Sequence, residues 1–220
     1  MGVDEARRAV RRLADAVEVE VLDPGPKSSD VGDEQQRRLV ALGRFRAALE
    51  AEKLVVAAAG AQTAEAAAEA VWLGASLADL SAITGRSRQA ARKRWPELGA
   101  IHRRRRWLGN HVDDIIHMAG RLAQRADDLA PTWAEGTYRK LVRHLREGLR
   151  RCETDFAPDA YDADRPAQRW RDLDDLVNVT LRELIELSGE PASPEAAFAL
   201  HGATGVLVYY DHATAETPDE

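Results

Sequence analysis

The side chains best suited to binding a charged partner are concentrated in residues 86–106, which hold nine Lys or Arg residues and one acidic residue. The polar side chains in the first part of this segment are Ser87, Arg88, Gln89, Arg92 and Lys93. Arginine can form two hydrogen bonds to guanine and glutamine two to adenine, whereas serine and lysine suit phosphate oxygens. The segment therefore predicts a surface that binds a polyanion and carries groups able to read nucleic-acid bases.

A second cationic group follows directly and consists of Arg103, Arg104, Arg105 and Arg106. Contiguous arginines around a helix cannot all face one groove of a duplex, but they can reach phosphates on both sides of it. We expect these four side chains to hold the phosphate backbone as an extension of the first group. The alternative is a solvated linker that only joins two domains.

The net charge of the whole chain argues against a protein that coats nucleic acid, because 37 acidic and 31 basic residues give a net charge of −6. Divided along the chain, the net charge is +8 in residues 86–106 and −11 in residues 151–220. Such segregation predicts a confined polyanion-binding face. DNA would repel the acidic third, which we expect to face away from it, toward a protein partner.

Two short helices around a glycine are expected to position the first cationic group. Ser76 and Asp79 form the S-x-x-D pattern of a capping box, which predicts a helix over residues 77–83. The apolar side chains of this helix, Leu80 and Ile83, are expected on its inner face.

The second short helix is predicted over residues 88–95. Gly85 tolerates a positive φ angle in the turn that precedes it, and Ser87 supplies its N-cap. Its expected inner face consists of Ala91, Trp95 and Leu98.

The segment SLADLSAITGRSRQAARKRW resembles the DNA-binding helix-turn-helix of many bacterial, especially actinobacterial, transcriptional regulators. The resemblance covers residues 63–98. Arg86 and Arg94 depart from the family pattern, which has apolar residues at these two places. The resemblance implies that the second helix reads bases through its early residues, which are Ser87, Arg88, Gln89 and Arg92.

The function implied by this resemblance is sequence-specific binding of double-stranded DNA by a transcriptional regulator. Helix-turn-helix proteins usually read two half-sites as a two-fold dimer, so we expect a homodimer. The alternative is a DNA-binding assembly protein, such as a phage-packaging or plasmid-maintenance subunit.

Helical periodicity dominates the rest of the chain and predicts an all-α fold, a helix-turn-helix module joined to an antiparallel helical bundle. Residues 1–60 are predicted as N-terminal helices, over 4–18 and from Asp33 to about Ala59, with a linker between them and a capacity for dimerisation. A third helix is expected from Thr63 to Gly74, within a DNA-binding module spanning 61–106. The apolar edge of the second helix consists of Leu39, Leu42, Phe45 and Leu49.

Residues 107–220 are predicted as a C-terminal bundle for dimerisation or for an effector or protein partner. Apolar residues step by three and four along 108–129 and 138–152, and less regularly along 173–187. Ser193 and Pro194 predict the start of a further helix, but the apolar segment 203–210 fits a helix or a strand equally well.

Other kinds of function find little support in the sequence. The single cysteine, Cys152, excludes an intramolecular disulfide, and no Walker-type, dinucleotide-binding or G-x-S-x-G pattern occurs. A cluster of His111, Asp113, Asp114 and His117 suggests a metal site, but helical spacing places the two histidines on different faces. We therefore expect no catalytic residue, metal or cofactor.

The longest run without charged residues has fifteen members, fewer than a membrane-spanning helix needs, and the first ten residues lack the apolar core of an export signal. We expect a cytoplasmic, nucleoid-associated protein without a membrane partner.

Overall fold

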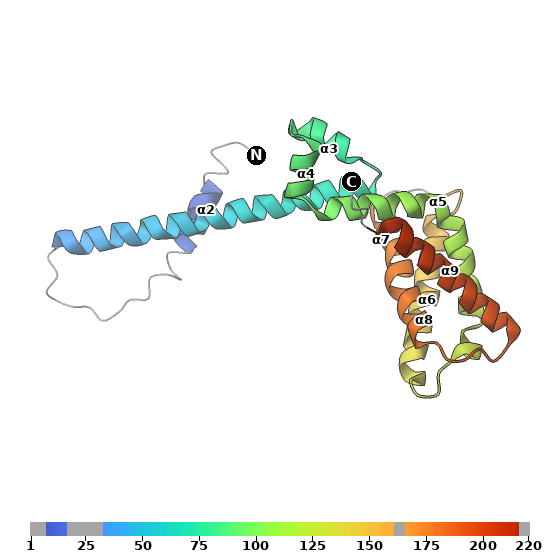
Figure 1. The fold of residues 1–220 in the computed structure, drawn as a ribbon. Helices are drawn as coiled ribbons and strands as arrows, with labels where there is room; N and C mark the ends of the chain where they lie inside the picture. Colours follow the sequence, from blue (N-terminus) through green and yellow to red (C-terminus); the bar gives the residue numbers. More distant parts are fainter. Residues whose placement is uncertain (1–7, 17–32, 161–165, 216–220) are drawn as a thin grey trace. The chain divides into compact units, whose positions relative to one another are not determined.

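The fold is given by a computed structural model that describes residues 8–16, 33–160 and 166–215. Figure 1 shows that the regular structure in these ranges is helical, which confirms the predicted all-α class. The chain divides into two units, residues 1–65 and 66–220. The predicted linker and both ends of the predicted first helix lie outside the described residues.

The first unit contains a short helix, residues 8–16, and most of the long helix α2 (Asp33–Trp72). The prediction of two helices separated near Gly60 is wrong, because α2 runs without a break through this glycine (Figure 1). Alanine has the highest helix propensity, and the alanines on both sides outweigh the roughly 1 kcal/mol that one interior glycine costs. The predicted apolar edge of this helix is exposed to solvent.

The second unit begins with the end of α2 and two short helices, α3 (Leu77–Thr84) and α4 (Arg88–Arg94). The buried side chains Leu80 and Ala91 confirm part of the expected inner face. Ile83 was expected there as well, but 82% of it is exposed.

The remaining helices pack around one hydrophobic core. Ile115 and Leu122 on α5 (Glu97–Gln124) and Leu145 on α6 (Glu135–Asp155) are among its members, as the stepped apolar pattern predicts. Trp107, just before that pattern, belongs to the core as well. The segment 203–210, for which helix and strand stayed open, is helical and buries Ala203, Leu207 and Tyr210. The elements are α5 (Glu97–Gln124), η1 (Ala126–Leu129), α6 (Glu135–Asp155), α7 (Gln168–Asp175), the π-helical segment η2 (Leu176–Leu181), α8 (Arg182–Leu187) and α9 (Pro194–Thr214).

Helix α5 links the short helices to this core. It begins after Pro96, so the cationic residues 103–106 lie within a helix rather than in a flexible linker. At His111 the backbone leaves helical geometry (φ −132°, ψ 17°), which kinks α5 just beyond the cationic run. The cationic run 103–106 therefore lies before the kink, together with the core residues Trp107 and Leu108, and the core residues Ile115, Ala119 and Leu122 lie after it.

Candidate nucleic-acid interface

Helix α3 is fixed at its start by a reciprocal cap. The Asp79 amide donates to the Ser76 hydroxyl at 3.2 Å, and the Ser76 amide donates to the Asp79 carboxylate at 2.8 Å. The Ser76 hydroxyl also donates to the Asp79 carboxylate, at 2.8 Å, and the two bonds that this carboxylate accepts from Ser76 lower the pKa of Asp79, because they stabilise its charged form. The capping box predicted from the sequence is confirmed.

The turn between α3 and α4 depends on Gly85 and Ser87. Gly85 has a φ of 63° and a ψ of 16°, the left-handed conformation that an L side chain adopts only at a cost. The Ser87 hydroxyl accepts a hydrogen bond from the Ala90 amide at 3.2 Å and so caps α4. Three residues therefore connect the two helices, and Ser87 can still donate its hydroxyl hydrogen to a ligand.

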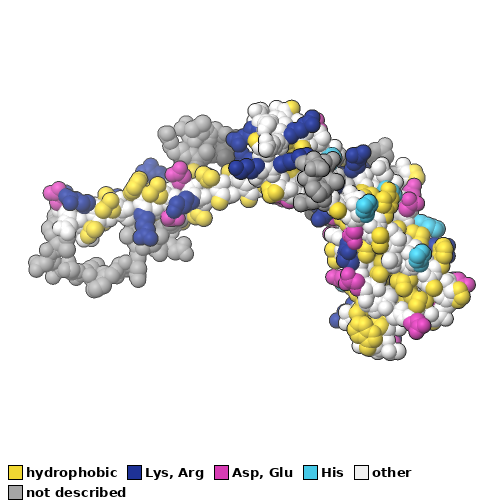
Figure 2. Space-filling view, viewed as in Figure 1, with side chains coloured by type: hydrophobic (Ala, Val, Ile, Leu, Met, Phe, Trp, Pro, Cys, Tyr) yellow, Lys and Arg dark blue, Asp and Glu magenta, His cyan; other side chains and the backbone are white. Residues whose placement is uncertain are grey.

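The outer face of α4 is polar and exposed. Its members are Arg88, Gln89, Arg92 and Lys93. At 3.6 residues per turn these four side chains lie within an arc of about 140°, and Ala91, which is buried, lies on the other side of the helix. Figure 2 shows Lys and Arg side chains around α3 and α4, where few acidic side chains are visible.

Two arginines, Arg86 just before α4 and Arg94 at its end, differ in their surroundings. Arg86 is exposed in the turn. Arg94 is also exposed, but its guanidinium carbon lies 4.9 Å from the centre of the Trp95 ring, within the range of a cation–π contact. Trp95 itself is buried, as its expected place on the inner face predicts.

Three of the four arginines in the run 103–106 make contacts inside the protein. The Arg103 Nε donates to the Thr214 carbonyl oxygen at 3.1 Å, and Arg104 forms an ion pair with Asp174 at 3.3 Å. Arg106 is exposed, whereas the other three arginines of the run are partly buried. The run was expected to face phosphates, and the structure instead gives three of its guanidinium groups partners on other helices.

Arg105 has the most extensive internal contacts of the run. Its Nε donates to the Trp72 carbonyl oxygen at 2.9 Å, and its guanidinium carbon lies 3.3 Å from the centre of the Trp170 ring. Burial and the nearby Arg169 charge lower the pKa of Arg105. A Cβ atom at Gly109 would lie 2.7 Å from the Arg105 guanidinium, so the glycine leaves the room that this side chain occupies. Arg105 thus connects the end of α2 and α7 to α5.

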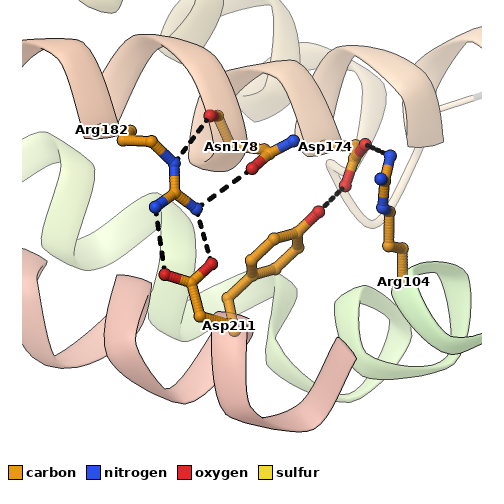
Figure 3. A network of polar contacts seen from close by, with 6 residues as sticks. Arg104, Asp174, Asn178, Arg182 and Asp211 are labelled. Atoms are coloured by element: carbon orange, nitrogen blue, oxygen red, sulfur yellow. Dashed lines mark hydrogen bonds and ion pairs between the residues drawn. The ribbon is translucent and has the colours of Figure 1, made fainter. Parts of the chain in front are cut away.

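Behind Arg104 lies a buried carboxylate that the sequence did not reveal as important (Figure 3). Asp174 is 5% exposed and accepts a hydrogen bond from the Tyr210 hydroxyl at 2.5 Å. Burial raises the pKa of Asp174, although Tyr210 and Arg104 oppose the change. The sequence signal that could have found this residue is an aspartate directly after Leu173, within the predicted apolar pattern of residues 173–187.

A second ion pair lies beside this group (Figure 3). Arg182 donates two hydrogen bonds to the Asp211 carboxylate, at 3.0 and 2.5 Å, and one to the Asn178 side-chain oxygen at 3.1 Å. The pair raises the pKa of Arg182. These contacts hold η2 and α8 against α9.

The histidines of the suspected metal cluster have different environments. His111 stacks on Trp107 with ring centres 4.5 Å apart, and its Nδ1 lies 2.7 Å from the Trp107 carbonyl oxygen, whereas His117 is exposed. In the described part of the chain no group of three His, Cys, Asp or Glu side chains could hold a metal ion. Cys152 is buried, which raises the pKa of its thiol to about 12.

Comparison of the chain with family models, with curated proteins and with solved structures gives no match. Among the described residues, no helix has both the length and the apolar character required to cross a membrane. What the surface binds must therefore be deduced from its own side chains.

Proposed function

We propose that this protein is a transcriptional regulator that binds double-stranded DNA sequence-specifically, with α3, the turn and α4 as a helix-turn-helix and α4 as the recognition helix. The observation that carries the proposal is the exposed polar face of α4, opposite the buried Ala91. Caps at Ser76 and Ser87 and the left-handed Gly85 define the two helices on which this face depends.

The side chains divide into two groups by chemistry. Arg88, Gln89 and Arg92 have the geometry to bond base edges in the major groove. Ser87, Lys93 and the exposed Arg106 suit phosphates, which position a protein without specifying a sequence. Because Arg103, Arg104 and Arg105 contact other helices, their contribution to phosphate binding is smaller than their charges suggest.

Two recognition helices are needed in this proposal, because one short helix contacts few bases and most proteins of this kind read two half-sites. We therefore propose a homodimer, with helices α5 to α9 as an antiparallel bundle beside the DNA-binding module. Its exposed acidic side chains then face a protein partner, and the protein lies in the cytoplasm with the nucleoid.

The proposal is tested by selecting fragments of the source genome that the full chain retains, followed by anisotropy titration of a selected duplex and a scrambled duplex at fixed salt. Arg88→Ala and Gln89→Ala should each weaken binding to the selected duplex by roughly 5- to 150-fold, the value of one bidentate base contact, and should hardly change the scrambled one. Arg143→Ala is the matched control, because Arg143 is an exposed arginine on α6.

Arg106→Ala should weaken both duplexes alike and reduce the slope of log affinity against log salt by about 0.9, the value for one phosphate contact. Equal losses for Arg88→Ala and Arg143→Ala, or no retained fragment, would refute the proposal. A ring or filament on DNA would instead indicate the assembly-protein alternative.

A further inference from the structure

The long helix α2 carries an apolar stripe that nothing in the described structure covers. The stripe consists of Leu42, Phe45, Leu49 and Val56. Of these, Phe45 is 63% exposed and Val56 65% exposed, although both are large and apolar. Leu39, at the edge of the stripe, is 52% exposed.

The spacing of the stripe is that of a coiled coil. Leu42, Leu49 and Val56 recur every seven residues, and Phe45 lies three residues after the first of them. Leu42 and Phe45 then occupy a and d positions of a heptad, the positions that face a second helix. On the opposite side of α2, Ala47 and Ala51 are buried, so the exposed stripe is a separate face of the helix.

We infer that this stripe binds the same stripe of a second copy of the chain, as a parallel coiled coil in register. The exposed area is sufficient for this pairing. At about 150 to 200 Å² for a fully exposed large apolar side chain, the stripe and Leu39 expose about 400 to 550 Å² per copy. A standard interface buries roughly 800 Å² per partner, somewhat more than half of it apolar.

One acidic side chain interrupts the stripe, Glu52, at the next d position. In a parallel pair in register the two Glu52 side chains face each other, and this repulsion disfavours the pair. Each Glu52 also packs beside Lys53, the following e side chain of the other helix, which offsets the repulsion. Lys53 bonds the neighbouring Glu50 at 2.8 Å within one helix, so this pairing requires it to turn from Glu50 toward Glu52 of the second copy.

In chain order α3 and α4 follow α2 directly, and parallel pairing keeps both copies of them at the same end of the paired helices. This deepens the proposed homodimer by naming its surface, but the pairing itself does not depend on DNA.

The test is the mass of the full chain in solution, measured by sedimentation without DNA. The wild type should be a dimer, and Leu49→Gln should weaken it by roughly 10- to 100-fold, because each copy loses a partly exposed apolar side chain from the interface. Leu54→Gln is the matched control, since Leu54 is 52% exposed on α2 but lies outside the stripe. A monomeric wild type, or equal effects of the two changes, overturns the inference.

Orientation is tested by oxidising two single variants, Leu42→Cys and Val56→Cys. Parallel pairing in register brings both positions close to their own copies, so both variants should form disulfide-linked dimers, whereas an antiparallel pair could link at most one of them. The wild type should not cross-link, because Cys152 is buried. Dimerisation without DNA binding would refute the proposed function but not this inference. DNA binding by a monomer would refute this inference and the proposed homodimer, but not the DNA-binding surface on α4.

Discussion

Replacement of Tyr210 by phenylalanine tests whether the buried Asp174 is ionised. The change removes one hydroxyl, which donates to the Asp174 carboxylate at 2.5 Å, and leaves the ring that packs edge-on against Trp107. A hydrogen bond to a charged group contributes about 1.5 to 3 kcal/mol, and one between neutral groups about 0.5 to 1.5 kcal/mol. We therefore expect Tyr210→Phe to lower the free energy of unfolding by about 2 kcal/mol at pH 7.

The loss should depend on pH in a defined direction. Burial raises the pKa of Asp174 above 3.8, and the Tyr210 hydrogen bond opposes this rise, so the variant should have a still higher pKa at Asp174. The contribution of a carboxyl whose pKa is raised on folding is fully present below its unfolded pKa and is lost as the pH rises through the folded pKa. Because the pKa of Asp174 rises further in the variant, the deficit of the variant in free energy of unfolding, relative to the wild type, should grow with pH. We expect about 1 kcal/mol near pH 4 and about 2 kcal/mol near pH 7.

Urea unfolding followed by tryptophan fluorescence measures this quantity, because all five tryptophans belong to the unit of residues 66–220. The control is Tyr209→Phe, since Tyr209 is largely exposed beside the same Trp107 ring. A deficit of about 1 kcal/mol at both pH values would show that Asp174 is protonated throughout, and one of about 2 kcal/mol at both would show that it is ionised throughout. A deficit no larger than that of the control would refute the hydrogen bond itself.

Two further changes examine other parts of the same unit. Arg105→Ala should lower the free energy of unfolding by roughly 2 kcal/mol, because it removes the hydrogen bond to Trp72 and the stack on Trp170. Arg105→Lys should not restore the lost stability. In the same urea titration Arg106→Ala, at an exposed position, should change the free energy of unfolding by less than about 0.5 kcal/mol. Cys152, with its thiol pKa raised to about 12, should react with a disulfide reagent at pH 8 only as fast as the protein opens, and immediate reaction in the absence of urea would contradict its burial.

The parts of the fold that the sequence predicts correctly are those with local signals. Ser76, Asp79, Gly85 and Ser87 act on neighbours within three or four residues, so their caps and the turn between them follow from residue type alone. The heptad steps of α5 and α6 are also local patterns and predict their buried faces. Ile83 fails because its position on α3 depends on which neighbouring helix covers it, and that is not a local property.

The role of the arginine run could not be predicted for the same reason. Arg104 and Arg105 find Asp174 and Trp170 about seventy residues further along the chain, and no spacing rule connects them. A solvated run and a run that contacts other helices have the same composition. From the sequence, the prediction that the cations of α4 form a binding surface is therefore firmer than the same prediction for the arginines of α5.

This difference changes how the segregated charge is understood. Two carboxylates of the acidic third, Asp174 and Asp211, form ion pairs with Arg104 and Arg182, so part of the negative charge stabilises the fold. Acidic side chains that stay exposed from α8 to the start of α9 include Glu183, Glu186, Glu190 and Glu195. A protein partner of the acidic third would meet exposed carboxylates such as these, whereas Asp174 is buried. The segregated charge is therefore not all available for binding, because part of it stabilises the unit of residues 66–220.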